Sequence, residues 1–391
     1  MLLGWLGFLL SSCESTATRE PEAAAPPAMT EPDLPFSPHQ TSVLGPEFLR
    51  LGRMRERDGG LAMVWTGTQL SFRVKSDSIW LHAEPEPERA SRPPDHLVYL
   101  TVIIDDEPPR NLALPYDRTR YLVATGLGDG AHTVTLFKRT EAMTGSVVLK
   151  SIELSEGGEW LAPPPQPERL IEFIGNSITC GYGNLGDPAC SFSAETEDGY
   201  QTYAALATRQ VRARMQTVCY SGRGVWRNYD QTQTGLLPEL YLRYHPLDST
   251  ATYPFNDPSP DVVVINLGTN DFSSGNPPEK PFVQAYAELI RTVRQYHPKA
   301  AVVLLTGPML NQDDGELRRP LSTQKQYLDA VVAQLSAEGM TDLYRFDLSP
   351  QVDGESYGCN FHPAVAKHRQ NGQELARFLA QTFDWPYQEV E

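Results

Sequence analysis

The chain has 391 residues, 40% of them hydrophobic, and a net charge of −16 at pH 7. This length allows two domains with sizeable cores. The acidic excess argues against a nucleic-acid partner and against a basic membrane-binding surface, because binding to phosphate needs clustered Lys and Arg. The spacing of the five cysteines fits neither a zinc site nor a CxxC redox motif.

The first 13 residues are typical of an exported lipoprotein. Residues 1–12, MLLGWLGFLLSS, form an apolar run that is too short to span a bilayer as a helix. The following Cys13 completes LSSC, which resembles a bacterial lipobox. No Lys or Arg precedes the run, so a plain signal peptide or a misplaced start codon is the alternative. We expect a periplasmic or cell-surface protein anchored to the membrane only through lipid on Cys13, or a secreted protein if the lipobox interpretation is wrong.

A second segment, residues 14–40, predicts a disordered linker. It is rich in Pro, Ala, Glu and Thr and has few large apolar residues. Such a composition cannot bury enough surface to order itself. The segment would hold the rest of the chain away from a membrane.

Residues 41–160 predict an all-β sandwich of jelly-roll type. Short runs of alternating apolar residues are separated by turn residues, without a long helical period. Trp65 and Trp80 could stack on sugars, but aromatic side chains more often fill cores, and we expect the core. The expected strands lie at 61–65, 70–74, 79–83, 98–104, 120–124, 132–137, 147–149 and 152–154.

After a boundary rich in Gly and Pro, residues 168–385 change to strands that alternate with helices. This pattern predicts an α/β domain with a parallel sheet flanked by helices. Strands are expected at 170–174, 215–220, 261–267, 301–306 and 343–347, and helices at 199–214, 282–296, 321–336 and 364–383.

Ser177 lies directly after the first of these strands, in the glycine-rich stretch GNSITCGYG. Ligands of open α/β sheets bind at the carboxyl ends of the strands, so this serine would be presented rather than buried. An ordinary turn or N-cap serine is the structural alternative. The nucleophile elbow of α/β-hydrolases, Gly-x-Ser-x-Gly, is set aside because position 179 is Thr.

Three later segments also follow strands or precede the last helix. SGRGV contains Gly224, whose backbone N–H could serve as an oxyanion donor, and GTND contains Asn270, whose amide could do the same. GCNFHP contains His362, a candidate general base for Ser177. Taken singly, each has a structural alternative: a glycine turn, an Asx-turn, and a structural or solvated histidine.

In chain order, Ser177, Gly224, Asn270 and His362 resemble the four blocks of the SGNH (GDSL-like) hydrolases, which implies a flavodoxin-like sheet. With the preceding β-sandwich, the chain resembles the acetyl-xylan esterases of carbohydrate esterase family 2 over about residues 41–383. The resemblance implies that Ser177 is the nucleophile and His362 the base. It also implies an oxyanion hole made by the N–H groups of Ser177 and Gly224 and the side chain of Asn270.

The same resemblance implies the removal of O-acetyl groups from xylan, glucomannan or related polysaccharides or oligosaccharides, without a metal ion or cofactor. Tyr182, Trp226 and Phe361 would shape a small acyl pocket. The alternatives are a catalytically inactive, carbohydrate-binding surface lipoprotein and an acyltransferase or lipase-like esterase on the same fold.

One position departs from the superfamily. Three residues before the histidine, where Asp is usual, the chain has Cys359. His362 could therefore act in a dyad, oriented by a carbonyl or by Asn360, or Asp353 or Asp271 could supply the carboxylate.

Besides Cys13, four cysteines remain: Cys180, Cys190, Cys219 and Cys359. They allow three complete pairings, and an exported protein permits disulfides. A Cys180–Cys359 bond would link the nucleophile and base segments, and a Cys180–Cys190 bond would close the loop between them. Free buried thiols are the alternative.

Overall fold

The computed structural model describes residues 39–87, 97–310, 320–352 and 357–389. Cys13, the expected linker up to residue 38, and Asp353 lie outside these ranges. Within them, no helix has both the length and the apolar character needed to cross a bilayer.

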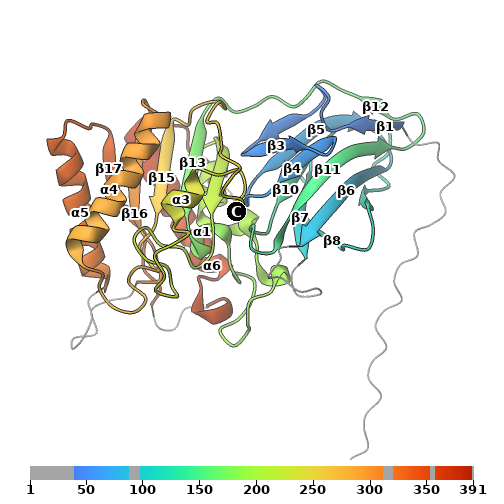
Figure 1. The fold of residues 1–391 in the computed structure, drawn as a ribbon. Coiled ribbons are helices and arrows are strands. Elements are labelled where there is room, and N and C mark those ends of the chain that lie inside the picture. The colour runs from blue at the N-terminus through green and yellow to red at the C-terminus, as the bar shows by residue number, and fades with distance from the viewer. Residues whose placement is uncertain (1–38, 88–96, 311–319, 353–356, 390–391) are drawn as a thin grey trace, which may run out of the picture. The chain divides into compact units, whose positions relative to one another are not determined.

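Two antiparallel sheets form the N-terminal β-sandwich (Figure 1). One sheet has the order β3-β4-β11-β6-β9 with β1 on β11, and the other β12-β5-β10-β7-β8 with β2 on β5. Apolar side chains from both sheets share one core. The strands are β1 (His39–Ser42), β2 (Leu49–Leu51), β3 (Met54–Arg57), β4 (Gly60–Met63), β5 (Gln69–Lys75), β6 (Ile79–Pro87), β7 (Val98–Ile104), β8 (Arg110–Leu114), β9 (Arg120–Ala124), β10 (His132–Lys138), β11 (Gly145–Leu154) and β12 (Glu159–Trp160).

The expected strands of this domain are confirmed, with one change. The runs at 147–149 and 152–154 belong to a single strand, β11, whose register shifts between Leu149 and Ser151. Trp65 and Trp80 are both buried, as expected of core residues. The Arg120 guanidinium lies 3.6 Å from the centroid of the Trp80 ring, so that ring is not free to stack on a sugar.

The second domain contains a five-stranded parallel sheet with the order β14-β13-β15-β16-β17. In chain numbering this order is 2-1-3-4-5, the flavodoxin-like arrangement. It places the topological switch point beside β13, between β13 and β15, where ligands of such folds bind. The strands are β13 (Leu170–Gly175), β14 (Arg214–Cys219), β15 (Val262–Asn266), β16 (Ala301–Thr306) and β17 (Leu343–Asp347).

Helices cover both faces of this sheet. Helices α3, α4 and α5 pack on one face and α2 and α6 on the other, and strand residues alternate between the two cores with period two. The helices are α1 (Ser177–Cys180), α2 (Tyr203–Gln210), α3 (Leu237–Tyr241), α4 (Glu279–Tyr296), α5 (Pro320–Ala337) and α6 (Val365–Phe383), with 3₁₀ turns η1 (Ala194–Thr196), η2 (Gly199–Gln201) and η3 (Cys359–Phe361).

The helix predicted at 199–214 is too long. The chain forms η2 and then begins a new helix, α2, after Thr202, whose hydroxyl oxygen accepts the N–H of Ala205. Helix α2 ends at Gln210, and Arg212 has a φ of 51°. A capping residue and a left-handed residue thus divide one apolar pattern into shorter elements.

The sandwich and the α/β domain share a buried polar contact. Arg53, between β2 and β3, places its Nη2 3.0 Å from the Glu172 carboxylate on β13. Its guanidinium also lies 4.6 Å from the ring centroid of Tyr241 and 4.1 Å from that of Tyr253. Because the arginine and the glutamate are both buried and paired, separating them would be costly.

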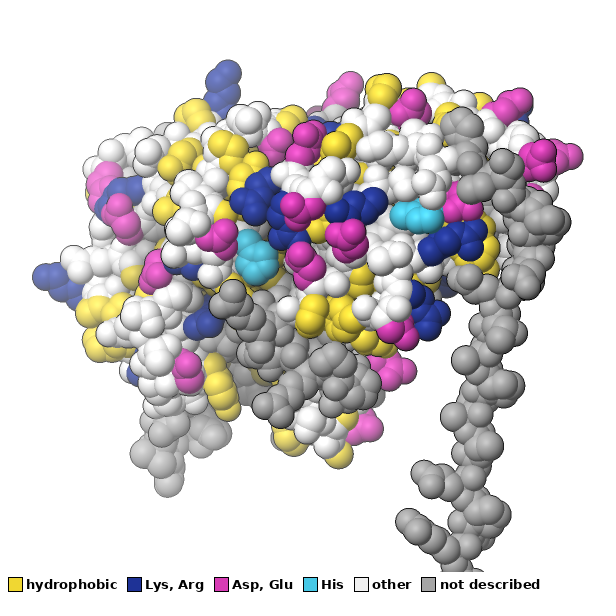
Figure 2. Space-filling view, turned by 45° about the vertical axis from the view of Figure 1, so that its right-hand side comes forward, with side chains coloured by type: hydrophobic (Ala, Val, Ile, Leu, Met, Phe, Trp, Pro, Cys, Tyr) yellow, Lys and Arg dark blue, Asp and Glu magenta, His cyan; other side chains and the backbone are white. Residues whose placement is uncertain are grey.

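On the face seen in Figure 2, Lys and Arg side chains lie among Asp and Glu rather than in a basic stripe. Ion pairs such as Lys325–Asp347 and Arg291–Glu338 join some of the exposed or partly exposed charges of the protein. Pairs of this kind at a surface contribute little to stability.

Candidate active site

Three of the predicted side chains meet in one pocket of about 1000 Å³. Ser177 follows β13, Asn270 follows β15, and His362 comes from the loop before α6. The carboxyl ends of neighbouring parallel strands meet at one edge of the sheet, which brings residues far apart in the chain together. The pocket is also lined by Met143, Tyr182, Ser221, Gly222, Tyr229, Asn360 and Phe361.

Ser177 is the first residue of α1 and lines the pocket, but it is almost fully buried, contrary to the prediction that it is presented rather than buried. The Asn176 side chain caps this helix, because its Oδ1 accepts the N–H of Ile178 at 3.1 Å. Gly181 ends it with a φ of 94°, a conformation that favours glycine. The first N–H groups of a helix have no intrahelical partner, so the Ser177 N–H can bind an anion.

His362 is in position to take a proton from Ser177. Its Nε2 lies 2.9 Å from the Ser177 Oγ, and its Nδ1 lies 3.2 Å from the carbonyl oxygen of Cys359. A carbonyl can only accept, so Nδ1 carries the proton and Nε2 presents its lone pair to the serine. Burial lowers the pKa of His362 to about 4, which keeps the ring neutral near pH 7.

Among the described residues, neither the Asp271 carboxylate nor the Asn360 side-chain amide is hydrogen-bonded to the histidine ring. The buried Asp271 instead accepts the backbone N–H groups of Val225, Trp226 and Arg227, at 3.1, 2.8 and 2.9 Å. Burial raises the pKa of this carboxyl to about 6. The Asn360 amide donates to the Tyr182 hydroxyl at 2.9 Å. Within the residues that the structure describes, main-chain carbonyl groups, first that of Cys359 and then that of Asn360, hold the histidine ring and no carboxylate does, which favours a dyad.

The pocket has aromatic walls. The Tyr182 ring lies 4.3 Å from the His362 ring, centroid to centroid, and stacks on Phe192 at 4.4 Å. Phe361 lines the pocket and is 63% exposed. Tyr182 and Phe361 are thus placed to shape the pocket, whereas Trp226 does not line it.

The structure agrees with the predicted oxyanion donor at Asn270 but not with the one at Gly224. The Asn270 Nδ2 donates one hydrogen to the Arg223 carbonyl at 2.8 Å, which leaves its second hydrogen for a ligand. Gly224 does not line the pocket, and its N–H donates to the Asn228 Oδ1 at 3.2 Å. The glycine in the pocket wall is Gly222, two residues earlier, with a φ of 77°. The geometry therefore favours Gly222, not Gly224, as the second glycine-turn donor.

Two disulfides flank the pocket. Cys180 is bonded to Cys219 and Cys190 to Cys359, with Cα–Cα distances of 5.7 and 4.8 Å. The predicted pairings of Cys180 with Cys359 or Cys190 are wrong, because Cys180 on α1 lies against the end of the neighbouring strand β14. No group of His, Cys, Asp or Glu side chains suited to hold a metal ion occurs in the described part of the chain.

Family models match both domains. The model described as carbohydrate esterase 2 N-terminal matches residues 50–164, and that of the GDSL-like lipase/acylhydrolase family matches residues 173–370. The chain is 35% identical over 345 residues to the cellulase/esterase CelE of Acetivibrio thermocellus, covering 87% of this chain and 40% of that protein. The chain thus spans well under half the length of CelE.

Two further relatives match over nearly their whole length. An acetylxylan esterase/glucomannan deacetylase of Cellvibrio japonicus is 26% identical over 385 residues, which cover 97% of this chain and 96% of that protein. A solved structure of a family two carbohydrate esterase from Clostridium thermocellum, in complex with cellohexaose, superimposes with a TM-score of 0.79 at 30% identity. That match covers 86% of this chain and 99% of the solved one.

Proposed function

The chain belongs to the GDSL-like lipase/acylhydrolase family, as a carbohydrate esterase of family 2, and we propose that it removes acetyl groups from xylan- or glucomannan-type polysaccharide. The observation that carries this proposal is the 2.9 Å contact between the Ser177 Oγ and the His362 Nε2 at the pocket. The acetyl group and the polysaccharide class are those in the name of the Cellvibrio japonicus relative.

In the first half of the reaction, the Ser177 Oγ attacks the ester carbonyl carbon while the His362 Nε2 takes the serine proton. The Nδ1–H stays hydrogen-bonded to the Cys359 carbonyl and stabilises the ring as it becomes positively charged. The N–H groups of Ser177 and Gly222 and the Asn270 amide stabilise the negative oxygen. One such donor is typically worth about 3–4 kcal/mol in the transition state.

The tetrahedral intermediate then collapses and breaks the bond to the sugar oxygen, which receives the proton from His362. This leaves an acetyl group on the Ser177 Oγ. A water molecule attacks that ester with His362 again as the base, and acetate and free serine are released. No carboxylate is needed if the neutral, correctly oriented imidazole is already provided by burial and the Cys359 carbonyl.

We propose further that the chain is exported and lipidated on Cys13. The sequence of residues 1–13 supports this, and the two disulfides fit an oxidising compartment. Mass spectrometry of the mature N-terminus would show a lipid on Cys13. An unmodified N-terminus beyond a signal-peptide cleavage site would replace this part of the proposal with simple secretion.

Acetate release from acetylated xylan and glucomannan tests the activity. We expect Ser177→Ala and His362→Ala each to lower kcat by at least about 10³-fold, as for other nucleophiles and bases. Ser336→Ala, an exposed serine on α5, is the matched control and should retain wild-type activity. Circular dichroism of all variants checks that they are folded.

Acyl-chain length distinguishes the alternatives. On p-nitrophenyl esters, rates should fall from acetate to butyrate to octanoate. A rise with chain length would favour a lipase-like esterase. A folded wild type that binds polysaccharide but hydrolyses no ester would favour the catalytically inactive binding protein.

A further inference from the structure

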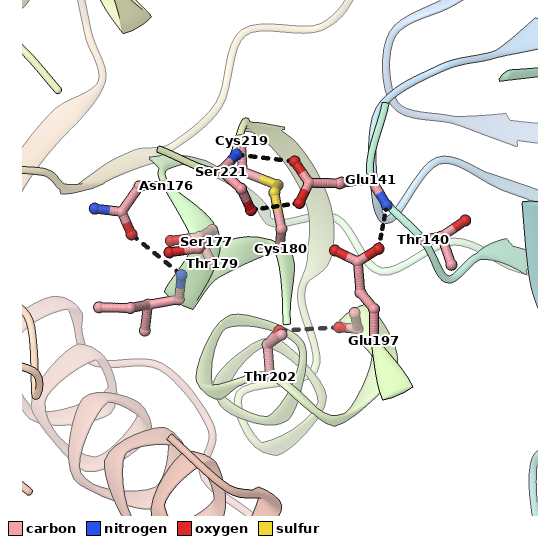
Figure 3. The surroundings of a disulfide bond; sticks show 12 residues. Thr140, Glu141, Asn176, Ser177, Thr179, Cys180, Glu197, Thr202, Cys219 and Ser221 are labelled. Atoms are coloured by element: carbon pink, nitrogen blue, oxygen red, sulfur yellow. Dashed lines mark hydrogen bonds between the residues drawn. A yellow bond between two sulfur atoms is a disulfide. The ribbon is translucent and has the colours of Figure 1, made fainter. Parts of the chain in front are cut away.

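A loop of the sandwich reaches the wall of the active-site pocket. It joins β10 to β11, and its Met143 lines the pocket. Its Glu141 is fully buried and holds Ser221, which follows β14 of the other domain. One carboxylate oxygen, Oε2, accepts the Ser221 N–H at 2.8 Å, and the other, Oε1, accepts the Ser221 hydroxyl (Figure 3).

This contact acts on the neighbouring residue, Gly222. Apart from its two chain neighbours, nothing lies within 4 Å of the place where a Cβ would stand on Gly222, so the molecule is open on that side of the residue. Its conformation therefore depends on its neighbours. The Gly222 carbonyl accepts the Tyr229 N–H at 2.9 Å. The preceding residue, Ser221, is held by Glu141 and lies two residues after Cys219, which is bonded to Cys180. The direction of the Gly222 N–H is thus set from both sides.

Glu141 is itself held by a second buried carboxylate. The Glu197 Oε2 accepts the Glu141 N–H at 3.0 Å. The ammonium of the buried Lys138 donates to the Thr140 carbonyl at 2.6 Å, and its charge favours the ionised form of both glutamates. Burial raises the pKa of both carboxyls and lowers that of Lys138. Three buried ionisable groups are costly to maintain, and such clusters gather at functional sites more than elsewhere.

Joining the two domains does not require this cluster, because Glu172 already does so. Its carboxylate accepts hydrogen bonds from Arg53, Gln216 and Tyr241, and none of these residues lines the pocket. Glu141 differs from Glu172 because its partner, Ser221, lies next to Gly222, and Gly222 lines the pocket.

We propose that Glu141 is a positioning residue for the oxyanion hole: through Ser221 it sets the direction of the Gly222 N–H. The sandwich domain is then part of the esterase's catalytic apparatus and not only a carbohydrate-binding module or spacer. This inference rests on the proposed esterase function.

The main test is Glu141→Gln, measured with acetylated xylan and with p-nitrophenyl acetate. The amide keeps one acceptor oxygen but turns an NH₂ group towards the second Ser221 donor. We expect kcat to fall about 10- to 100-fold on both substrates, somewhat less than full loss of an oxyanion donor, with KM within about twofold. A sandwich that served only to bind polysaccharide would instead raise KM for xylan and leave the small ester unaffected.

Ser221→Ala is the milder second variant and keeps the N–H bond while removing the hydroxyl. It should lower kcat about 3- to 10-fold on both esters. Glu172→Gln is the matched control, since it also changes a buried glutamate between the domains. It should lower the unfolding midpoint but leave kcat per folded molecule within about twofold.

The outcomes separate this inference from the function on which it rests. A wild type that hydrolyses neither ester overturns both. An active wild type with unchanged kcat in Glu141→Gln overturns the inference alone. If Glu141→Gln does not fold, Ser221→Ala decides: an unchanged kcat on p-nitrophenyl acetate rejects the positioning role. A loss of kcat in Glu172→Gln as large as that in the Glu141 variant rejects it too.

Discussion

The side of the pocket that carries the proposed nucleophile, Ser177, and the side that carries the proposed base, His362, each have a disulfide, yet these nucleophile and base sides are built differently. On the nucleophile side, Ser177 and Cys180 on α1 and Cys219 at the end of β14 are all buried. On the base side, Asn360 and Phe361 of the loop before α6 are exposed, although the neighbouring Cys359 is buried. Asn360 and Phe361 have φ values of 51° and 61° there. Left-handed backbone is costly for a bulky residue such as phenylalanine and persists only where the surroundings enforce it.

The difference indicates where precision is needed. The oxyanion donors must match a developing charge, and the nucleophile side fixes them by burial and by backbone hydrogen bonds. The base needs only a neutral ring at the right distance. The Cys359 carbonyl, the Tyr182 ring and the Cys190–Cys359 bond supply that beneath the exposed Asn360 and Phe361. Variants on the two sides should therefore fail in different ways.

The largest effect should come from Asp271 on the nucleophile side. In Asp271→Ala, the buried N–H groups of Val225, Trp226 and Arg227 lose their acceptor. We expect the free energy of unfolding to fall by about 3–5 kcal/mol, since buried donors without partners are costly. Urea titration of wild type and variant measures the loss. A loss below about 1 kcal/mol would mean that these N–H groups find other acceptors.

The base-side disulfide should be the more sensitive of the two to reductants. Cys190 is partly exposed, whereas Cys180 and Cys219 are fully buried. Mild reductant followed by alkylation and peptide mapping should label Cys190 and Cys359 first. The double variant Cys190→Ala/Cys359→Ala should lose about 2–5 kcal/mol of stability.

In the same double variant, the Cys359 carbonyl should hold His362 less well, and kcat should fall with the fold intact. Labelling of Cys180 and Cys219 first, or at the same rate, would contradict the comparison between the two sides.

Much of this arrangement could be predicted because it depends on strand ends. Ser177 and Asn270 each follow a β-rich run, and parallel strands bring such ends to one edge. The choice between Gly222 and Gly224 could not be made from SGRGV, since both are glycines in one turn. It depends on which N–H the Asn228 side chain occupies.

Other features depend on long-range packing. Glu141 and Met143 belong to the sandwich, and no local pattern marks them as neighbours of the site. The disulfide pairing follows from β14 lying beside β13, an order that the run of strands along the chain leaves open. The short strands β1, β2, β3, β8 and β12 were missed because a few residues carry too little periodicity to be recognised.

The pH dependence should show the low basicity of the base. The proposed mechanism needs neutral His362, and burial lowers the pKa of this histidine to about 4. At pH 5.5 a histidine with the ordinary pKa near 6.5 would lose about 10-fold in kcat/KM, whereas this enzyme should lose less than about 1.5-fold. A pH–rate profile from 4 to 8 measures this. An acidic limb centred near 6.5 would show that water reaches the ring.

Protonation of His362 should lower the stability of the protein as well as its activity as the pH falls. The unfolded chain binds a proton at His362 near pH 6.5 and the folded chain only near 4. Between these values the unfolded state binds more protons, so the contribution of His362 to stability decreases as the pH falls.

The smallest effects should distinguish direct from indirect support of the base. Tyr182→Phe removes the hydroxyl that accepts the Asn360 amide but keeps the ring beside His362. It should cost about 0.5–1.5 kcal/mol of stability and change kcat by less than about threefold. Asn360→Gly keeps the left-handed backbone and should have the same small effects as Tyr182→Phe.

Tyr182→Ala removes the ring itself, and because His362 then loses its stacking partner, kcat should fall about 10-fold. If Asn360→Gly lowered kcat as much as Tyr182→Ala, Asn360 would orient the histidine directly, and the base side would depend on a polar contact rather than on ring packing.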